Sequence, residues 1–162
     1  MNRRLIWIAL GFVGCAAART PALHSSTLPA VELTRVDGQA ESLKAALGGS
    51  VAVIDLWATW CAACELERPK LERLHTAYAS QGLRVIGLDV GEPPRVVAAY
   101  LAENRVSYPN YLDPDFRLTD ALGEKRLPTI LVVDRDGLIV HRSQTLDAET
   151  LAAIKCQLGS VP

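Results

Sequence analysis

The chain has 162 residues, of which 49% are hydrophobic and 22% charged, and its net charge at pH 7 is −1. This length fits one globular domain with an N-terminal extension, and the composition supplies enough apolar residues for a sizeable core. Without Arg3 and Arg4 the net charge becomes −3. Both values argue against a nucleic-acid partner and against electrostatic attachment to a membrane surface.

The N-terminus has the pattern of an export signal. Residues 1–4 are short and basic, and residues 5–13 form an apolar run too short to span a bilayer, which needs about twenty residues. The run leads into Phe-Val-Gly-Cys15, which resembles a bacterial lipobox, so we expect residues 1–15 to be a lipoprotein signal with Cys15 lipidated. Cleavage after residues 16–18, giving a soluble periplasmic or secreted protein, stays open. In both cases we expect the domain on the periplasmic side of a bacterial membrane, where disulfides persist.

The next segments predict a tether followed by the start of a folded domain. Residues 16–30 are rich in Ala, Ser, Thr and Pro without periodicity, which is typical of a flexible tether. The domain is expected over residues 31–160. Alternating apolar and polar residues at 31–36 predict a half-buried strand, and Ser42 is placed to cap a short helix that ends at Leu47.

Two thiols then meet at a strand-to-helix junction. The apolar run 51–56 predicts a buried strand, and residues 61–80 predict the following helix, with Cys61 at its start and Cys64 one turn further. Unpaired backbone N–H groups and the helix dipole stabilise a thiolate at a helix N-terminus. Such a thiolate can attack a substrate disulfide, and the second thiol can then resolve the intermediate. These residues therefore predict dithiol–disulfide exchange.

The rest of the chain predicts a mixed α/β architecture. In the helix after Cys61, the spacing of Leu66, Leu71, Leu74 and Tyr78 predicts one apolar face. The last two strands flank a turn signal at 134–137 and should form a hairpin. The order of elements indicates an α/β sandwich with a mixed sheet. The remaining elements are expected as strands at 83–89, 108–112, 129–133 and 138–142, and as helices at 95–104, 116–122 and 147–158.

Two cysteines with this spacing also occur in zinc sites and haem attachment sites, and neither is expected here. A zinc site needs a second Cys/His pair, but His24, His75 and His141 are scattered. Haem attachment needs histidine after the second cysteine, where this chain has Glu65. We therefore expect no metal and no cofactor. Cys156, in the last predicted helix, is interpreted as a small packed apolar residue.

Four features together resemble the thioredoxin superfamily. They are the Trp60-Cys61-x-x-Cys64 junction after a strand, Asp55 within that strand, Leu127-Pro128-Thr, and the closing hairpin with its helix. More narrowly, residues 31–158 resemble the TlpA/ResA-like branch of exported, membrane-anchored thiol–disulfide reductases. The phrase Val-Ile-Asp-Leu-Trp-Ala-Thr-Trp-Cys and the segment 108–123 carry this likeness. It implies a thioredoxin-like fold, a three-layer α/β/α sandwich with an N-terminal strand extension and a TlpA-type insert.

The resemblance also implies roles for residues around the cysteines. Pro128 would be a cis proline that lies against the disulfide, where an extended substrate segment can pair with the backbone. Leu127 and Trp60 would contact the same substrate. Asp55 would be a buried base with a raised pKa that moves a proton to or from Cys64.

The function expected is reduction of disulfides in exported proteins by Cys61 and Cys64. The resemblance implies a membrane protein that supplies electrons, with apocytochrome c or copper-site cysteines as clients. The Ala-Ala pair between the thiols and Glu65 after them favour a reductant. A thiol oxidase or disulfide isomerase of the same fold stays open, because it differs in redox potential alone. A copper metallochaperone is less favoured, since that group has three residues between its cysteines, and peroxide reduction would need a Pro/Thr-rich loop around a lone cysteine.

Overall fold

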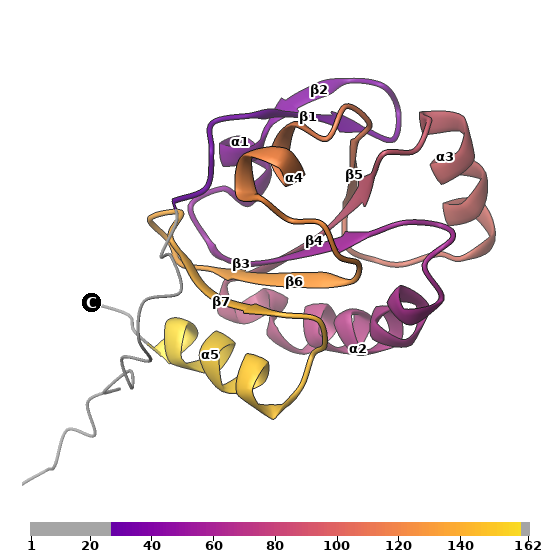
Figure 1. The fold of residues 1–162 in the computed structure, drawn as a ribbon. Helices are drawn as coiled ribbons and strands as arrows, with labels where there is room; N and C mark the ends of the chain where they lie inside the picture. Colours follow the sequence, from indigo (N-terminus) through magenta and orange to yellow (C-terminus); the bar gives the residue numbers. More distant parts are fainter. Residues whose placement is uncertain (1–26, 160–162) are drawn as a thin grey trace, which may run out of the picture.

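The computed structural model describes residues 27–159, which form a seven-stranded mixed sheet with helices on both faces (Figure 1). This is the expected thioredoxin-like sandwich. The expected export signal with Cys15, and residues 16–26 of the expected tether, lie outside the described residues. Within the described part, no helix is long and apolar enough to cross a bilayer.

The sheet places three parallel strand ends together at the edge where the cysteine loop begins. Its order is β2-β1-β5-β4-β3-β6-β7. Strand β4 runs parallel to β3 and β5, whereas β6 runs antiparallel to β3. The strands are β1 (Glu32–Arg35), β2 (Ala40–Ser42), β3 (Val51–Trp57), β4 (Leu83–Val90), β5 (Asn110–Asp113), β6 (Thr129–Val133) and β7 (Ile139–Ser143).

Helices cover both faces of the sheet. Helices α1 and α4 pack on one face and α2 and α5 on the other, and α3 lies beside β5 (Figure 1). Because side chains alternate along a strand, Ile54 of β3 belongs to the first core and Val53 to the second. The helices are α1 (Leu43–Leu47), α2 (Ala62–Tyr78), the 3₁₀ turn η1 (Ala79–Gln81), α3 (Pro94–Glu103), α4 (Arg117–Leu122) and α5 (Ala148–Gly159).

Local signals explain where several elements begin and end. Ser42 caps α1 by accepting a hydrogen bond from the backbone N–H of Ala45 at 3.2 Å. Gly48 ends that helix in the left-handed conformation, with φ of 60°. The short helix expected after Ser42 is therefore confirmed. Strand β2 was not expected, because three residues are too few to show a period.

The predicted apolar face of α2 was wrong at one position. Leu71 and Leu74 are buried as expected, but the Leu66 side chain is 70% exposed. The buried stripe instead runs through Cys64 and Glu67 before it reaches Leu71. Each residue turns about 100° around a helix, so Leu66 lies beside this stripe, and a carboxylate takes the place predicted for leucine.

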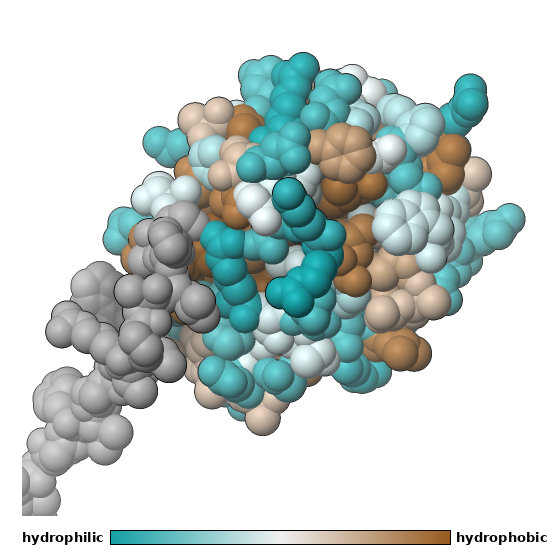
Figure 2. All heavy atoms as spheres, viewed as in Figure 1, coloured by the Kyte–Doolittle hydropathy of each residue, from teal (hydrophilic) through white to brown (hydrophobic). Residues whose placement is uncertain are grey.

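The last residues of the expected tether lie against the folded core. Thr27 forms an isolated β-bridge with Leu138, and the backbone N–H of Leu28 donates a 2.8 Å hydrogen bond to the carbonyl of Gly137. The Leu28 side chain packs on the core that α1 covers. The surface drawn in Figure 2 is a mosaic of polar and apolar side chains, in keeping with the small net charge.

Candidate active site

Cys61 and Cys64 are joined by a disulfide at the start of α2, with their Cα atoms 5.3 Å apart. Cys61 is the N-cap of the helix, and its Sγ accepts a hydrogen bond from the backbone N–H of Cys64 at 3.2 Å. Both side chains are buried, Cys64 more deeply than Cys61. After reduction, the same N–H groups and the helix dipole favour a thiolate on Cys61.

A tight turn presents the first cysteine. The backbone N–H of Cys61 donates to the carbonyl of Ala58 at 3.1 Å, which closes the turn between β3 and α2. Trp60, within this turn, is 70% exposed beside the disulfide. Trp57, at the end of β3, is buried and packs on the ring of Tyr100, with centroids 5.5 Å apart. One tryptophan is therefore available to a substrate and the other belongs to the core.

The segment before β6 lies beside the cysteines. Leu127 packs against the apolar cluster that contains Cys61 and Cys64. The Leu127–Pro128 peptide bond is cis, and Pro128 is buried. Thr129 pairs with Leu56 of β3, so Pro128 stands next to the strand end from which the cysteine turn continues. The fold thus brings together residues that lie more than sixty positions apart in sequence.

Asp55 is buried beneath the second cysteine. Its side chain is 3% exposed, and its Oδ1 accepts no hydrogen bond from residues 27–159. Burial and, to a smaller extent, the negative charge of Glu67 raise the pKa of Asp55, Arg68 opposes them, and the resulting pKa is about 7. A carboxyl group with this pKa can both accept and release a proton near neutral pH.

Asp55 and Cys64 line the same small cavity. Its volume of about 10 Å³ is close to the minimum that one water molecule needs. A proton can therefore pass between the thiol and the carboxylate through one intervening molecule, whereas no substrate fits. The lining consists of Asp55, Trp57, Cys64, Arg68, Leu101, Val106, Tyr108 and Asn110.

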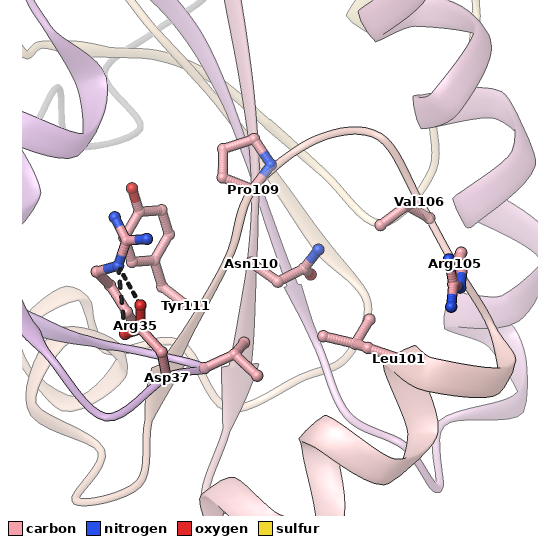
Figure 3. A pocket seen from close by; sticks show the side chains of 9 residues that line it. Arg35, Asp37, Leu101, Arg105, Val106, Pro109, Asn110 and Tyr111 are labelled. Carbon is pink, nitrogen blue, oxygen red and sulfur yellow. Dashed lines mark hydrogen bonds and ion pairs between the residues drawn. The ribbon is translucent and has the colours of Figure 1, made fainter.

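A wider pocket adjoins this cavity. It has a volume of about 520 Å³ and is drawn in Figure 3. Leu101, Val106 and Asn110 line both the pocket and the cavity. Figure 3 shows the Asn110 side chain directed toward Leu101 and Val106. These three side chains therefore lie between the pocket and the cavity that Asp55 lines.

Glu67 is a buried charge that the sequence interpretation missed. It accepts hydrogen bonds from the Lys70 ammonium at 2.7 Å, from the Thr145 hydroxyl at 3.0 Å and from the backbone N–H of Leu146 at 2.8 Å. These bonds tie α2 to the loop before α5. Glu67 stands three residues after Cys64, on the same helix face. That spacing was the signal available in the sequence.

We expect the substitution Glu67→Gln to lower the free energy of unfolding by about 1–3 kcal/mol at pH 7, because a charged acceptor of three hydrogen bonds is lost. Burial disfavours the charged form, but the hydrogen bonds from Lys70, Leu146 and Thr145 outweigh it and lower the pKa of Glu67. The charged group therefore stabilises the fold above its unfolded pKa, and this contribution disappears as pH falls through the lower folded value.

Urea unfolding at pH 7 and at pH 3 measures this difference. The control is Glu103→Gln, which changes an exposed carboxylate near the end of α3. If Glu67→Gln lowers the free energy of unfolding as much at pH 3 as at pH 7, the shape of the side chain and not its charge matters at this position.

This fold, with a disulfide-bonded cysteine pair at the N-terminus of α2, defines a thiol–disulfide oxidoreductase of the thioredoxin superfamily. The model of the AhpC/TSA family matches residues 25–142, and the chain belongs to that family. Together these findings confirm the predicted fold and the predicted exchange chemistry.

Two relatives carry the description thiol-disulfide oxidoreductase ResA. The one from Geobacillus thermodenitrificans is 29% identical over 138 residues, which span 83% of this chain and 79% of the relative. The one from Halalkalibacterium halodurans is 31% identical over 112 residues, which span 68% of this chain and 64% of the relative. The likeness to the ResA branch is therefore confirmed.

Solved structures share the fold. A thiol:disulfide interchange protein of the thioredoxin family from Chlorobium tepidum has 25% identity and a TM-score of 0.69, over 86% of this chain and all of that one. The thioredoxin domain of a thiol-disulfide oxidoreductase from Bacteroides vulgatus has 21% identity and a TM-score of 0.73, over 84% of this chain and 99% of that one.

Proposed function

We propose that this chain is an exported, lipid-anchored thiol–disulfide reductase whose Cys61–Cys64 pair reduces disulfides in exported proteins. The observation that carries the proposal is the cysteine pair at the N-terminus of α2, directly above the buried Asp55. The ResA relatives support it. In this proposal residues 1–15 are the signal, Cys15 carries the lipid, residues 16–30 are the tether and residues 31–160 are the domain.

The proposed reaction has two exchange steps. The Cys61 thiolate attacks one sulfur of the substrate disulfide, a mixed disulfide forms, and the other substrate sulfur leaves as a thiolate that takes up a proton. Cys64 then gives its proton to Asp55 and attacks the Cys61 sulfur. The second substrate thiol is released, and the Cys61–Cys64 disulfide re-forms. Two electrons pass to the substrate, so a membrane donor protein must reduce the pair again.

The surface around the disulfide supports a role in binding an extended polypeptide. Trp60 is exposed beside Cys61, and Leu127 packs next to the pair. The backbone before Pro128 offers hydrogen-bonding groups to an added strand. We propose that these three residues bind the substrate, and by analogy that apocytochrome c or copper-site cysteines are the clients.

The reduction potential distinguishes a reductase from the oxidase or isomerase alternative. Ala62 and Ala63 bring no charge to the pair, and the Glu65 carboxylate lies beside it, accepting a hydrogen bond from the Tyr100 hydroxyl at 2.9 Å. Nothing between the two cysteines makes the thiol strongly acidic. We therefore expect a potential toward the thioredoxin end of the scale, near or below roughly −250 mV.

The measurement uses the full chain equilibrated in glutathione or dithiothreitol buffers. Mass spectrometry of the alkylated peptide that contains Cys61 and Cys64 reads this pair separately from the other cysteines. A value above roughly −180 mV would overturn the reductase proposal in favour of an oxidase or isomerase. Intact mass of the exported protein tests the anchor, since a diacylglycerol on Cys15 and cleavage after Ala18 predict different masses.

A further inference from the structure

Another buried carboxyl group, besides those of Asp55 and Glu67, lies close to the active-site turn and has no part in the mechanism described above. Asp89, near the end of β4, is fully buried, and neither of its oxygens has a hydrogen bond of ordinary geometry within the described part of the chain. An ionised carboxylate in such a place is costly. Asp89 therefore needs either a cation or a proton.

The charged group that faces Asp89 is another carboxylate, that of Glu92. Burial, followed by interaction with the Glu92 carboxylate, raises the pKa of Asp89 to about 8. Strands β3 and β5 place Trp57 and Leu112 beside Asp89 in the sheet register, and neither is charged. Asp113, the other acidic residue at this edge, accepts hydrogen bonds from α4 instead. Two adjacent carboxyl groups share one proton, because both cannot ionise cheaply.

Glu92 in turn holds the active-site turn. Its two oxygens accept hydrogen bonds from Thr59, one from the backbone N–H at 2.6 Å and one from the hydroxyl at 2.7 Å. Thr59 lies within the turn that the Cys61-to-Ala58 hydrogen bond closes, next to the exposed Trp60. A charged acceptor makes these bonds stronger than neutral ones. The position of Glu92 therefore sets the position of the turn that presents Trp60 and Cys61.

We propose that Asp89 is a positioning residue for thiol–disulfide exchange: by sharing one proton with Glu92, it keeps Glu92 bound to Thr59 and so holds the turn that docks the substrate. When the pair loses that proton, two negative charges face each other in a buried site. Glu92, which is only half-buried, then moves toward solvent and releases Thr59. This inference concerns exchange itself and applies to a reductase and to an oxidase alike.

The experiment compares two disulfide probes on the reduced full chain between pH 6 and 9.5. 4,4′-Dithiodipyridine is small and reports the reactivity of the Cys61 thiolate without docking. An extended peptide with one internal disulfide must in addition bind to the turn that contains Thr59. Both rate constants depend in the same way on the ionised fraction of Cys61, so the rate constant for the peptide divided by that for 4,4′-dithiodipyridine is independent of this ionisation. In the unmodified chain we expect this ratio to be constant up to neutral pH and to fall about tenfold above pH 8.

Three variants distinguish an effect of the Glu92–Thr59 hydrogen bonds from a general loss of structure. In Asp89→Asn the amide donates to Glu92 at every pH, so the ratio should stay high throughout. In Thr59→Val the hydroxyl bond is absent, so the ratio should be low at every pH. Asp120→Asn changes an exposed carboxylate on α4 and should follow the unmodified chain. Circular dichroism at each pH checks that the variants are folded. Superimposable pH profiles for the unmodified chain and Asp89→Asn would overturn the proposal.

Discussion

Replacing Cys61 by serine is expected to abolish disulfide exchange, whereas replacing Cys64 by serine should stop the reaction one step later. Cys61 is the N-cap of α2, where the helix start favours its thiolate, and it is the less buried of the two thiols. Without this nucleophile, turnover should fall on the order of a thousandfold or more. Without Cys64, the first attack proceeds but nothing releases the substrate from Cys61.

Non-reducing mass spectrometry distinguishes the two variants. After mixing with a peptide disulfide, Cys64→Ser should retain the peptide on Cys61 with a yield near one per chain, and Cys61→Ser should retain none. The double variant is the matched control for labelling of other cysteines. A stable adduct on Cys64 in Cys61→Ser would reverse the assigned roles of nucleophile and resolving thiol.

Residues close together in sequence were the predictable part of this site. Cys61 and Cys64 are three positions apart and follow a run of apolar residues, so the spacing alone placed both thiols at a helix start. The capped helix after Ser42 was predictable for the same reason, because its signals lie within seven residues. Asp55 was predictable as a buried group, since it stands inside that apolar strand.

The place of Pro128 beside the cysteine pair was expected from the family resemblance, but other contacts between distant residues were not predictable. Thr59 and Glu92 are 33 positions apart, and nothing local in either segment indicates that they are bonded. Glu67 was not singled out from the sequence, because a helix pattern assigns carboxylates to the outside unless their partners are known. Those partners, Thr145 and Leu146, are almost eighty positions further along the chain.

The acidic groups of this site also influence one another's protonation. Glu67 is kept ionised by three hydrogen bonds, and its fixed negative charge helps to hold a proton on Asp55. One carboxylate thus serves to raise the pKa of the other toward the working pH. In the proposal above, Asp89 and Glu92 repeat this arrangement beside the cysteine turn: Glu92 accepts the hydrogen bonds and Asp89 holds the proton.

Replacing Asp55 by asparagine is expected to slow the resolving step about 10- to 100-fold near pH 7.5, because Cys64 loses the base that shares its cavity. With its pKa raised to about 7, Asp55 becomes a base as pH rises through neutrality, so the resolving rate of the unmodified chain should rise with it. The difference in resolving rate between Asp55→Asn and the unmodified chain should narrow below pH 6, where Asp55 is protonated. It should also narrow above pH 9, where the Cys64 thiol, with an ordinary pKa of about 8.5, ionises unaided.

Stopped-flow release of peptide from the preformed mixed disulfide measures this step directly, with Asp37→Asn, which changes an exposed carboxylate, as control.

The Asp55→Asn variant should also be more stable than the unmodified chain at pH 8. The folded protein keeps the Asp55 proton between about pH 4 and pH 7, whereas the unfolded chain does not, so this residue destabilises the fold increasingly over that interval. The stability gain should be a few kcal/mol at pH 8 and vanish near pH 4. A stability gain without any change in the resolving rate would identify Asp55 as a buried polar group outside the reaction.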